Sequence, residues 1–148
     1  MKDGNGLTEK TNTQNKTEPT GKPYIAYFSR NTVMLDLDDM HLSSVIKIAK
    51  NTTKNHNLGG YIITESSPNH YHAIFNEPQD WINIMMILFA FRKDSILAYA
   101  INQARKGFCA LRVNNAKNGY KPHIIKEYGK TDKAISEYKH ILNQYGET

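Results

Sequence analysis

Apolar residues recur along this chain with two spacings, one typical of strands and one typical of helices. The pattern predicts strands at 24–28, 32–38, 61–64, 70–75, 108–113 and 122–128. It predicts helices at 40–55, 78–92 and 95–105, and a last helix after Thr131. The resulting order, ββαββααββα, indicates an α+β fold in which helices pack on an antiparallel sheet.

The short links between strands predict three hairpins. Residues 29–32 join the first pair of strands, and Ser66-Ser67-Pro68-Asn69 forms a turn-rich loop within the second pair. The link in the third pair ends in Asn-Gly, a dipeptide favoured in hairpin turns. Asp39 is expected to cap the first helix and Asp94 or Ser95 the third, which Gly107 closes.

Composition divides the chain into a tail and one domain. Residues 1–22 hold almost no large apolar side chains, which predicts a disordered polar tail, and Pro23 opens a single domain at 23–148. The chain of 148 residues is 39% hydrophobic, enough for one core. The longest apolar run, 81–91, is too short to span a bilayer, and the N-terminus lacks an apolar signal segment. With a single cysteine, Cys109, these features predict a cytoplasmic protein with no membrane partner.

Two acids follow the apolar start of the second predicted strand. In Met34-Leu35-Asp36-Leu37-Asp38 the side chains alternate, so Asp36 and Asp38 share one face of the strand. Like charges this close repel each other unless a cation neutralises them. A hard divalent cation, Mg²⁺ or Mn²⁺, prefers such oxygen ligands, and the pair is therefore a candidate metal site.

Two histidines alternate in the same way in a later strand. His70 and His72 share one face and Tyr71 lies on the other. If this strand pairs with the acid-bearing strand, His72 faces the same site. The histidines then either coordinate a cation as neutral imidazoles or hydrogen-bond a phosphate.

A basic group surrounds the third predicted hairpin, and the whole chain carries a net charge of +5. Its members, interleaved with Tyr120 and Tyr128, are Arg105, Lys106, Arg112, Lys117, Lys121 and Lys126. This mixture suits phosphate contacts combined with base stacking, and it indicates a nucleic-acid partner. Gly-rich phosphate loops, zinc-finger spacings and nucleophile elbows are absent from the sequence.

These motifs together resemble those of the archaeo-eukaryotic primases, including the primase domains of plasmid replication proteins. Residues 34–38 are similar to the family's hydrophobic-Asp-hydrophobic-Asp motif, and residues 64–75 to its second motif, with His72 in the place of the motif histidine. Leu111-Arg112-Val113 is similar to the arginine-bearing strand found late in the same domain. The resemblance covers residues 23–129.

The resemblance implies an RRM-like catalytic module that joins nucleoside triphosphates on a single-stranded or template DNA. Asp36 and Asp38 then hold Mg²⁺ or Mn²⁺, and His72 acts with them in catalysis by contacting the phosphates of the incoming nucleotide. Substrate-binding positions follow at Ser66, His70, Arg112, Lys117 and Lys121. The family's third metal-binding acid has no counterpart at the end of an apolar strand here, so a reduced or inactive form stays open.

Two other interpretations remain. His70-Tyr71-His72 also fits the His-hydrophobic-His metal motif of rolling-circle replication nucleases, which need a helix-borne tyrosine nucleophile. Tyr99 and Tyr138 lie in predicted helices, but neither is followed by a lysine at the spacing those enzymes use. The second alternative is a nucleic-acid-binding module without catalysis.

Overall fold

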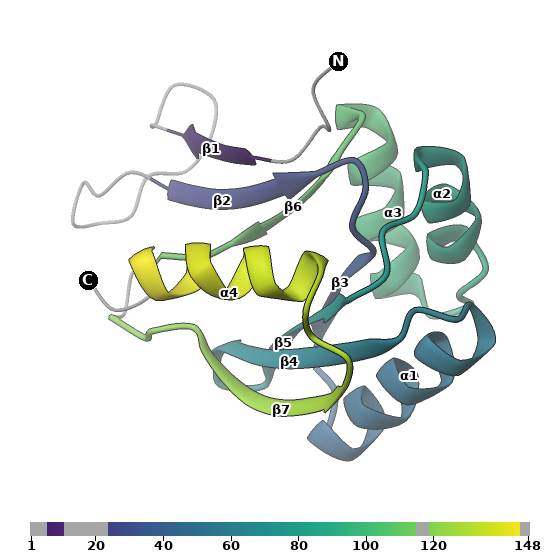
Figure 1. The fold of residues 1–148 in the computed structure, drawn as a ribbon, viewed down its shortest axis with the longest axis horizontal. Coiled ribbons are helices and arrows are strands. Elements are labelled where there is room, and N and C mark those ends of the chain that lie inside the picture. Colours follow the sequence, from purple (N-terminus) through teal and green to yellow (C-terminus); the bar gives the residue numbers. More distant parts are fainter. Residues whose placement is uncertain (1–5, 11–23, 115–118, 146–148) are drawn as a thin grey trace.

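The computed structural model describes residues 6–10, 24–114 and 119–145 (Figure 1). Its strands are β1 (Gly6–Lys10), β2 (Tyr24–Ser29), β3 (Met34–Asp38), β4 (Gly60–Ser67), β5 (His70–Phe75), β6 (Cys109–Arg112) and β7 (His123–Gly129). Its helices are α1 (Leu42–Asn55), α2 (Trp81–Phe89), α3 (Asp94–Lys106) and α4 (Ala134–Tyr145). The α+β class is confirmed, with antiparallel sheets and helices packed against them. From β2 onward the order is the expected ββαββααββα, consistent with an RRM-like arrangement.

A four-stranded antiparallel sheet in the order β3-β5-β4-β7 positions most of the candidate residues. Its centre is the β4–β5 hairpin, which confirms the second predicted hairpin. The turn places Asn69 at a φ of 66°, a left-handed conformation that asparagine tolerates better than most residues. Strand β3 pairs with the other side of β5, so the acid-bearing and histidine-bearing strands are direct neighbours.

The other two predicted hairpins are wrong. Strand β2 pairs with β1 and β6 in a separate three-stranded sheet, whereas its sequence neighbour β3 joins the four-stranded sheet. Between them, the Ser29 hydroxyl accepts hydrogen bonds from the backbone N–H groups of Asn31 and Thr32, and this turn carries the chain from one sheet to the other. Strand β7 pairs with β4 and not with β6.

The expected tail is described only at 6–10, where the chain forms a strand that the sequence did not predict. These residues form strand β1, which pairs antiparallel with β2 from Gly6 opposite Phe28 to Lys10 opposite Tyr24. Strand pairing uses backbone groups, so a segment poor in apolar side chains can still add to a sheet edge. The rest of the predicted tail lies outside the described residues.

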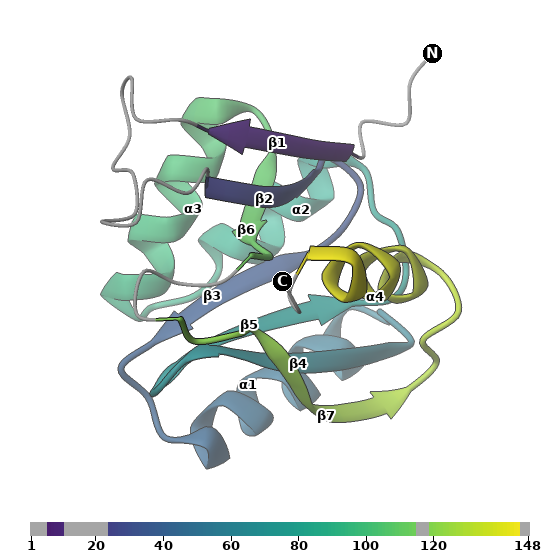
Figure 2. The same cartoon turned by 90° about the vertical axis from the view of Figure 1, so that its left-hand side faces the viewer.

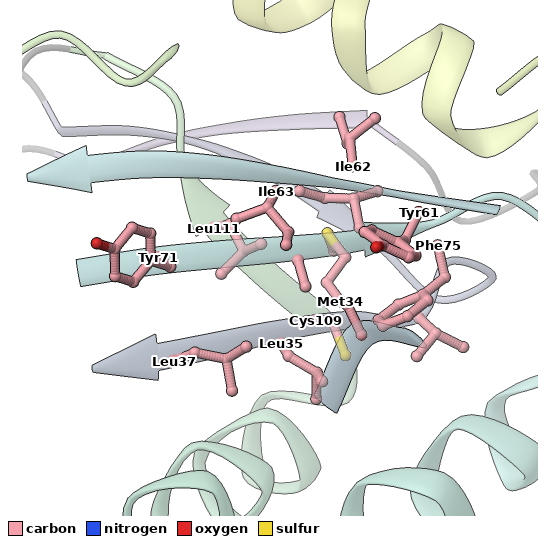
Figure 3. Packing of buried hydrophobic residues seen from close by; sticks show 14 of the residues in the cluster. Met34, Leu35, Leu37, Tyr61, Ile62, Ile63, Tyr71, Phe75, Cys109 and Leu111 are labelled. Atoms are coloured by element: carbon pink, nitrogen blue, oxygen red, sulfur yellow. The ribbon is translucent and has the colours of Figure 1, made fainter. Parts of the chain in front are cut away.

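Helices cover the four-stranded sheet on both sides, with α4 on one face and α1 on the other (Figure 2). Alternation along the strands fills the two layers: Ile62 projects toward α4, whereas Leu35 and Leu37 project to the other side (Figure 3). Strand β6 adds Cys109 and Leu111 to the same buried cluster (Figure 3). One hydrophobic core therefore joins the two sheets.

The helix ends differ in part from those expected. Helix α1 starts after His41, and Asp39 instead adopts a φ of 55° at the end of β3. Lys93 is the N-cap of α3, so Asp94 is its first helical residue, and neither of these helices has a side-chain cap. Gly107 ends α3 in the left-handed conformation, as expected. Within the described ranges, no helix combines the length and apolarity needed to cross a membrane.

Candidate metal and nucleotide site

Four titratable side chains meet on one face of the β3–β5 pair. In the register, Asp36 lies opposite His72 and Asp38 lies opposite His70. Residues directly opposite each other on an antiparallel pair project to the same side, so all four share the face that α4 also covers. His70 Nδ1 lies 2.8 Å from Asp38 Oδ1, and His72 Nε2 lies 3.6 Å from Asp36 Oδ1. The pairing thus unites two sequence motifs that are more than 30 residues apart.

The four side chains differ in how far they are exposed to solvent. The side chain of His72 is 7% exposed, whereas those of Asp38 and His70 are each 41% exposed and that of Asp36 is 34% exposed. The two carboxyl groups and His70 therefore reach solvent, and a ligand can approach them. His72 forms the floor of the site.

Arg112 joins this site from the other sheet. Its guanidinium donates 2.7 Å to the carbonyl oxygen of Ser66 and also donates to the carbonyl oxygen of Asn114. Its positive charge lowers the pKa of both Asp36 and His72, which places it within electrostatic reach of the pair. Arg112 lies on β6 of the three-stranded sheet, so the predicted arginine-bearing strand meets the acids where the two sheets join.

The charges of Asp36 and His72 are set chiefly by burial. Burial raises the pKa of Asp36 to about 7, and the negative charge of Asp38 and a hydrogen bond between the two carboxyl groups add to the effect. Burial lowers the pKa of His72 to about 3, with repulsion from Arg112 acting in the same direction. At neutral pH, His72 is therefore a neutral imidazole.

His70 behaves in the opposite way. Its hydrogen bond to Asp38 raises its pKa, and the negative charges of Asp38, Asp39 and Asp36 act in the same direction. The structure therefore pairs His70 with Asp38 through a partly exposed hydrogen bond, a contact that the sequence did not indicate.

The donor set suits a hard divalent cation only in part. Asp36 and Asp38 supply carboxylate oxygens on one face, and the pKa of Asp36 is raised chiefly by burial and in part by the charge of Asp38, a repulsion that a cation would relieve. The Nδ1 atom of His72 is buried without a hydrogen-bond partner in the described part of the chain. No group of three or more His, Cys, Asp or Glu side chains placed to hold a metal occurs among the described residues. The two acids would therefore supply only some of the ligands of such a cation.

The later acids are engaged elsewhere in the fold. Asp80 accepts a hydrogen bond from the backbone N–H of Asn83 at the start of α2, and Glu65 accepts one from the Tyr120 hydroxyl. Asp132 accepts one from the side chain of Asn76. A third carboxylate beside Asp36 and Asp38 is thus not found within the described ranges.

The remaining predicted positions lie in different places. Ser66 is buried, and its hydroxyl donates to the carbonyl oxygen of His70, so its side chain supports the turn. Lys121 is exposed just before β7, and because β6 and β7 do not pair, it does not share a hairpin with Arg112. Lys117 lies outside the described residues. Cys109 is fully buried, and burial raises the pKa of its thiol to about 12, so the thiol stays protonated.

Sequence reasoning missed Asn114. Its side-chain oxygen accepts a hydrogen bond from the backbone N–H of Ile25, and its own carbonyl oxygen accepts one from Arg112. It thereby fixes the end of β6 against β2 while it holds the arginine in place. Its position directly after an apolar strand was the available signal, but an asparagine there more often marks a turn.

No family model matches this chain, and a match is likewise absent among curated proteins and among solved structures.

Proposed function

We propose that this chain is a metal-dependent nucleotidyltransferase of the primase-polymerase type, which joins nucleoside triphosphates on a single-stranded DNA template. One observation carries the proposal: Asp36, Asp38 and His72 share one face of a sheet, and Arg112 reaches them from the second sheet. A cytoplasmic location, expected from the single cysteine, belongs to the same proposal.

Each side chain has a distinct part in the proposed reaction. Asp36 and Asp38 would hold Mg²⁺ or Mn²⁺, which when bound neutralises charge on the transferring phosphoryl group. His72, neutral and buried beside Asp36, offers a hydrogen bond to a phosphate oxygen without adding charge. Arg112 contributes positive charge at a position that the Ser66 and Asn114 carbonyl oxygens fix.

The burial of two tyrosines argues against the rolling-circle nuclease. That chemistry needs a helix-borne tyrosine hydroxyl that can attack a phosphodiester. Tyr99 of α3 is 8% exposed and Tyr138 of α4 is 0% exposed, so neither hydroxyl can meet a DNA strand without a rearrangement of the core. The paired acids also have no part in the nuclease interpretation.

Incorporation of a labelled nucleotide on a single-stranded template, with Mn²⁺ present, tests the proposal. We expect extended products from the wild type and none from Asp36→Asn or His72→Ala. His70→Ala should retain more activity than His72→Ala, because His70 is the more exposed of the two and pairs with a single acid.

Two outcomes would overturn the proposal. A protein–DNA adduct that survives denaturation would identify the nuclease instead. Salt-sensitive DNA binding with neither product nor adduct would leave the non-catalytic nucleic-acid-binding module, which the lack of a third carboxylate in the described residues favours.

A further inference from the structure

A second concave site lies between α1 and β7. It is a cavity of about 370 Å³ lined by Lys50, Thr53, Lys54, Asn57, Gly59 and Tyr128. That volume falls within the range of small-molecule sites. The cavity lies on the opposite face of the sheet from the acids. Ile62 projects toward α4, so its neighbour Tyr61 and the cross-strand partner Tyr128 project away from α4. It is therefore separate from the site at Asp36 and Asp38.

One wall of the cavity is the aromatic ring of Tyr128, which packs on a second tyrosine. Tyr128 is 52% exposed as a residue, and its ring stacks on the ring of the buried Tyr61 with 5.5 Å between centroids and an interplanar angle of 25°. One face of the Tyr128 ring is thus covered by the Tyr61 ring from the neighbouring strand, while much of Tyr128 remains open to solvent. A rigid, half-exposed ring is a ready platform for stacking a planar ligand.

The opposite wall is positively charged. Lys50 and Lys54 are four residues apart on α1, so they neighbour each other on one helix face, and both are exposed. Helix α1 contains no acidic residue to neutralise them. Lys126 of β7 projects to the same side of the sheet as Tyr128, two residues away, and it is also exposed.

Nearby carboxylates are already paired with other lysines. Glu77 approaches the cavity at Gly59, but both of its carboxylate oxygens bind Lys133 Nζ, at 2.8 and 3.0 Å. Glu127 lies opposite Ile62, so it projects to the α4 face, where it binds Lys139 at 2.6 Å. The charge that faces the cavity is therefore positive.

The cavity also contains an unsatisfied donor. Thr53 lines it, is only 8% exposed, and its hydroxyl has no hydrogen-bond partner within the described residues. Buried hydroxyl groups almost always have one, and an orphaned hydroxyl in a basic, aromatic cavity points to a polar ligand.

We propose that this cavity binds one unpaired nucleotide of a single-stranded nucleic acid, with the base stacked on Tyr128 and the adjoining phosphates on Lys50 and Lys54. An aromatic ring beside lysines is the combination that binds single strands without reading their sequence. The inference does not rest on the proposed catalysis, because binding here needs neither Asp36 nor a metal.

Fluorescence anisotropy of a labelled oligothymidylate of about 12 nucleotides, in EDTA, tests the site. Lys50→Gln/Lys54→Gln should weaken binding about tenfold or more and reduce the slope of log affinity against log salt by about two. Arg92→Gln/Lys93→Gln removes the same charge in the link between α2 and α3, outside the cavity lining, and should change affinity less than about threefold, which separates a local site from net charge.

The aromatic platform is tested by a matched pair of variants. Tyr128→Leu should weaken binding about tenfold, whereas Tyr128→Phe, which keeps the ring, should bind like the wild type. Thermal unfolding of each variant checks that Tyr128→Leu remains folded. A strand carrying 5-iodouracil should crosslink to Tyr128 on irradiation, and the lysine variants, altered only on the surface, should lose that crosslink.

Several results would overturn the inference. Equal losses for the two pairs of basic residues would show a diffuse charge effect. Binding that needs the lysines but not the ring would indicate an acidic partner of another kind. Equal affinity for a duplex, or for thymidine triphosphate at the same nucleotide concentration, would exclude an unpaired strand as the ligand.

Discussion

Replacing Asp36 with asparagine should stabilise the folded protein at alkaline pH when no divalent cation is present. Burial and the charge of Asp38 raise the pKa of Asp36 from 3.8 to about 7. The folded state therefore holds this proton more tightly than the unfolded chain does. Below about pH 4 the carboxyl group is protonated in both states, and stability is lost as the pH rises through the window up to about 7.

The size of the effect follows from the same values. The difference between 3.8 and about 7 corresponds to at most about 4 kcal/mol of lost stability above neutral pH. Because the Asp36 side chain is 34% exposed, solvent screening reduces this, and we expect about 1–2 kcal/mol. For a domain of this size, that corresponds to a rise in Tm of about 3–8 °C in the variant.

Urea unfolding of the wild type and Asp36→Asn, in EDTA at about pH 4 and about pH 8, measures the difference. Asp39→Asn is the matched control, because Asp39 is an exposed neighbour at a φ of 55°, a conformation that asparagine also adopts. The control should change stability by less than about 0.5 kcal/mol at either pH. An Asp36→Asn variant that is less stable at the higher pH, or equally stabilised at both, would refute the reasoning.

Two further predictions concern His72, in the floor of the site, and Gly60, at the start of β4. Burial lowers the pKa of His72 to about 3, so the stability that neutral His72 contributes is lost as the pH falls from about 6.5 toward 3. Across that window the free energy of unfolding of His72→Gln, measured in urea, should rise relative to that of the wild type. A difference in free energy of unfolding between the two proteins that stays the same across this pH range would contradict the prediction. A Cβ on Gly60 would lie 2.6 Å from the backbone nitrogen of Lys130 and against the carbonyl oxygens of Tyr128 and Lys130, so Gly60→Ala should cost more than about 2 kcal/mol. Gly107→Ala, with nothing within 4 Å and only its φ of 82° to strain, should cost less, and equal costs would contradict the packing argument.

Local patterns predicted the elements and the faces on which side chains lie. Alternation predicted that Asp36 shares a face with Asp38 and that His70 shares a face with His72. The pairing of β3 with β5, which brings the two faces together, came from the structure. Helical spacing likewise located α1 and α3 to within about two residues at each end.

Strand partners were harder to predict, because pairing depends on which sheet edges are free and not on the turn alone. A short link between β2 and β3 indicated a hairpin, yet the two strands belong to different sheets. The same error grouped Tyr128 with Arg112 around a hairpin that does not form. In the fold, β7 pairs with β4 and Tyr128 joins the lysines of α1, residues more than 70 positions away.

Manganese binding tests the central claim most directly, since every step of the proposed reaction depends on a cation at Asp36 and Asp38. The electron paramagnetic resonance signal of free Mn²⁺ can be followed as protein is added, with and without a non-hydrolysable nucleoside triphosphate to supply phosphate ligands. We expect the wild type to take up the ion, more tightly with the nucleotide, and Asp36→Asn/Asp38→Asn to leave the signal of the nucleotide-only control unchanged. Equal uptake by the two proteins, or none by the wild type with nucleotide present, would contradict the account.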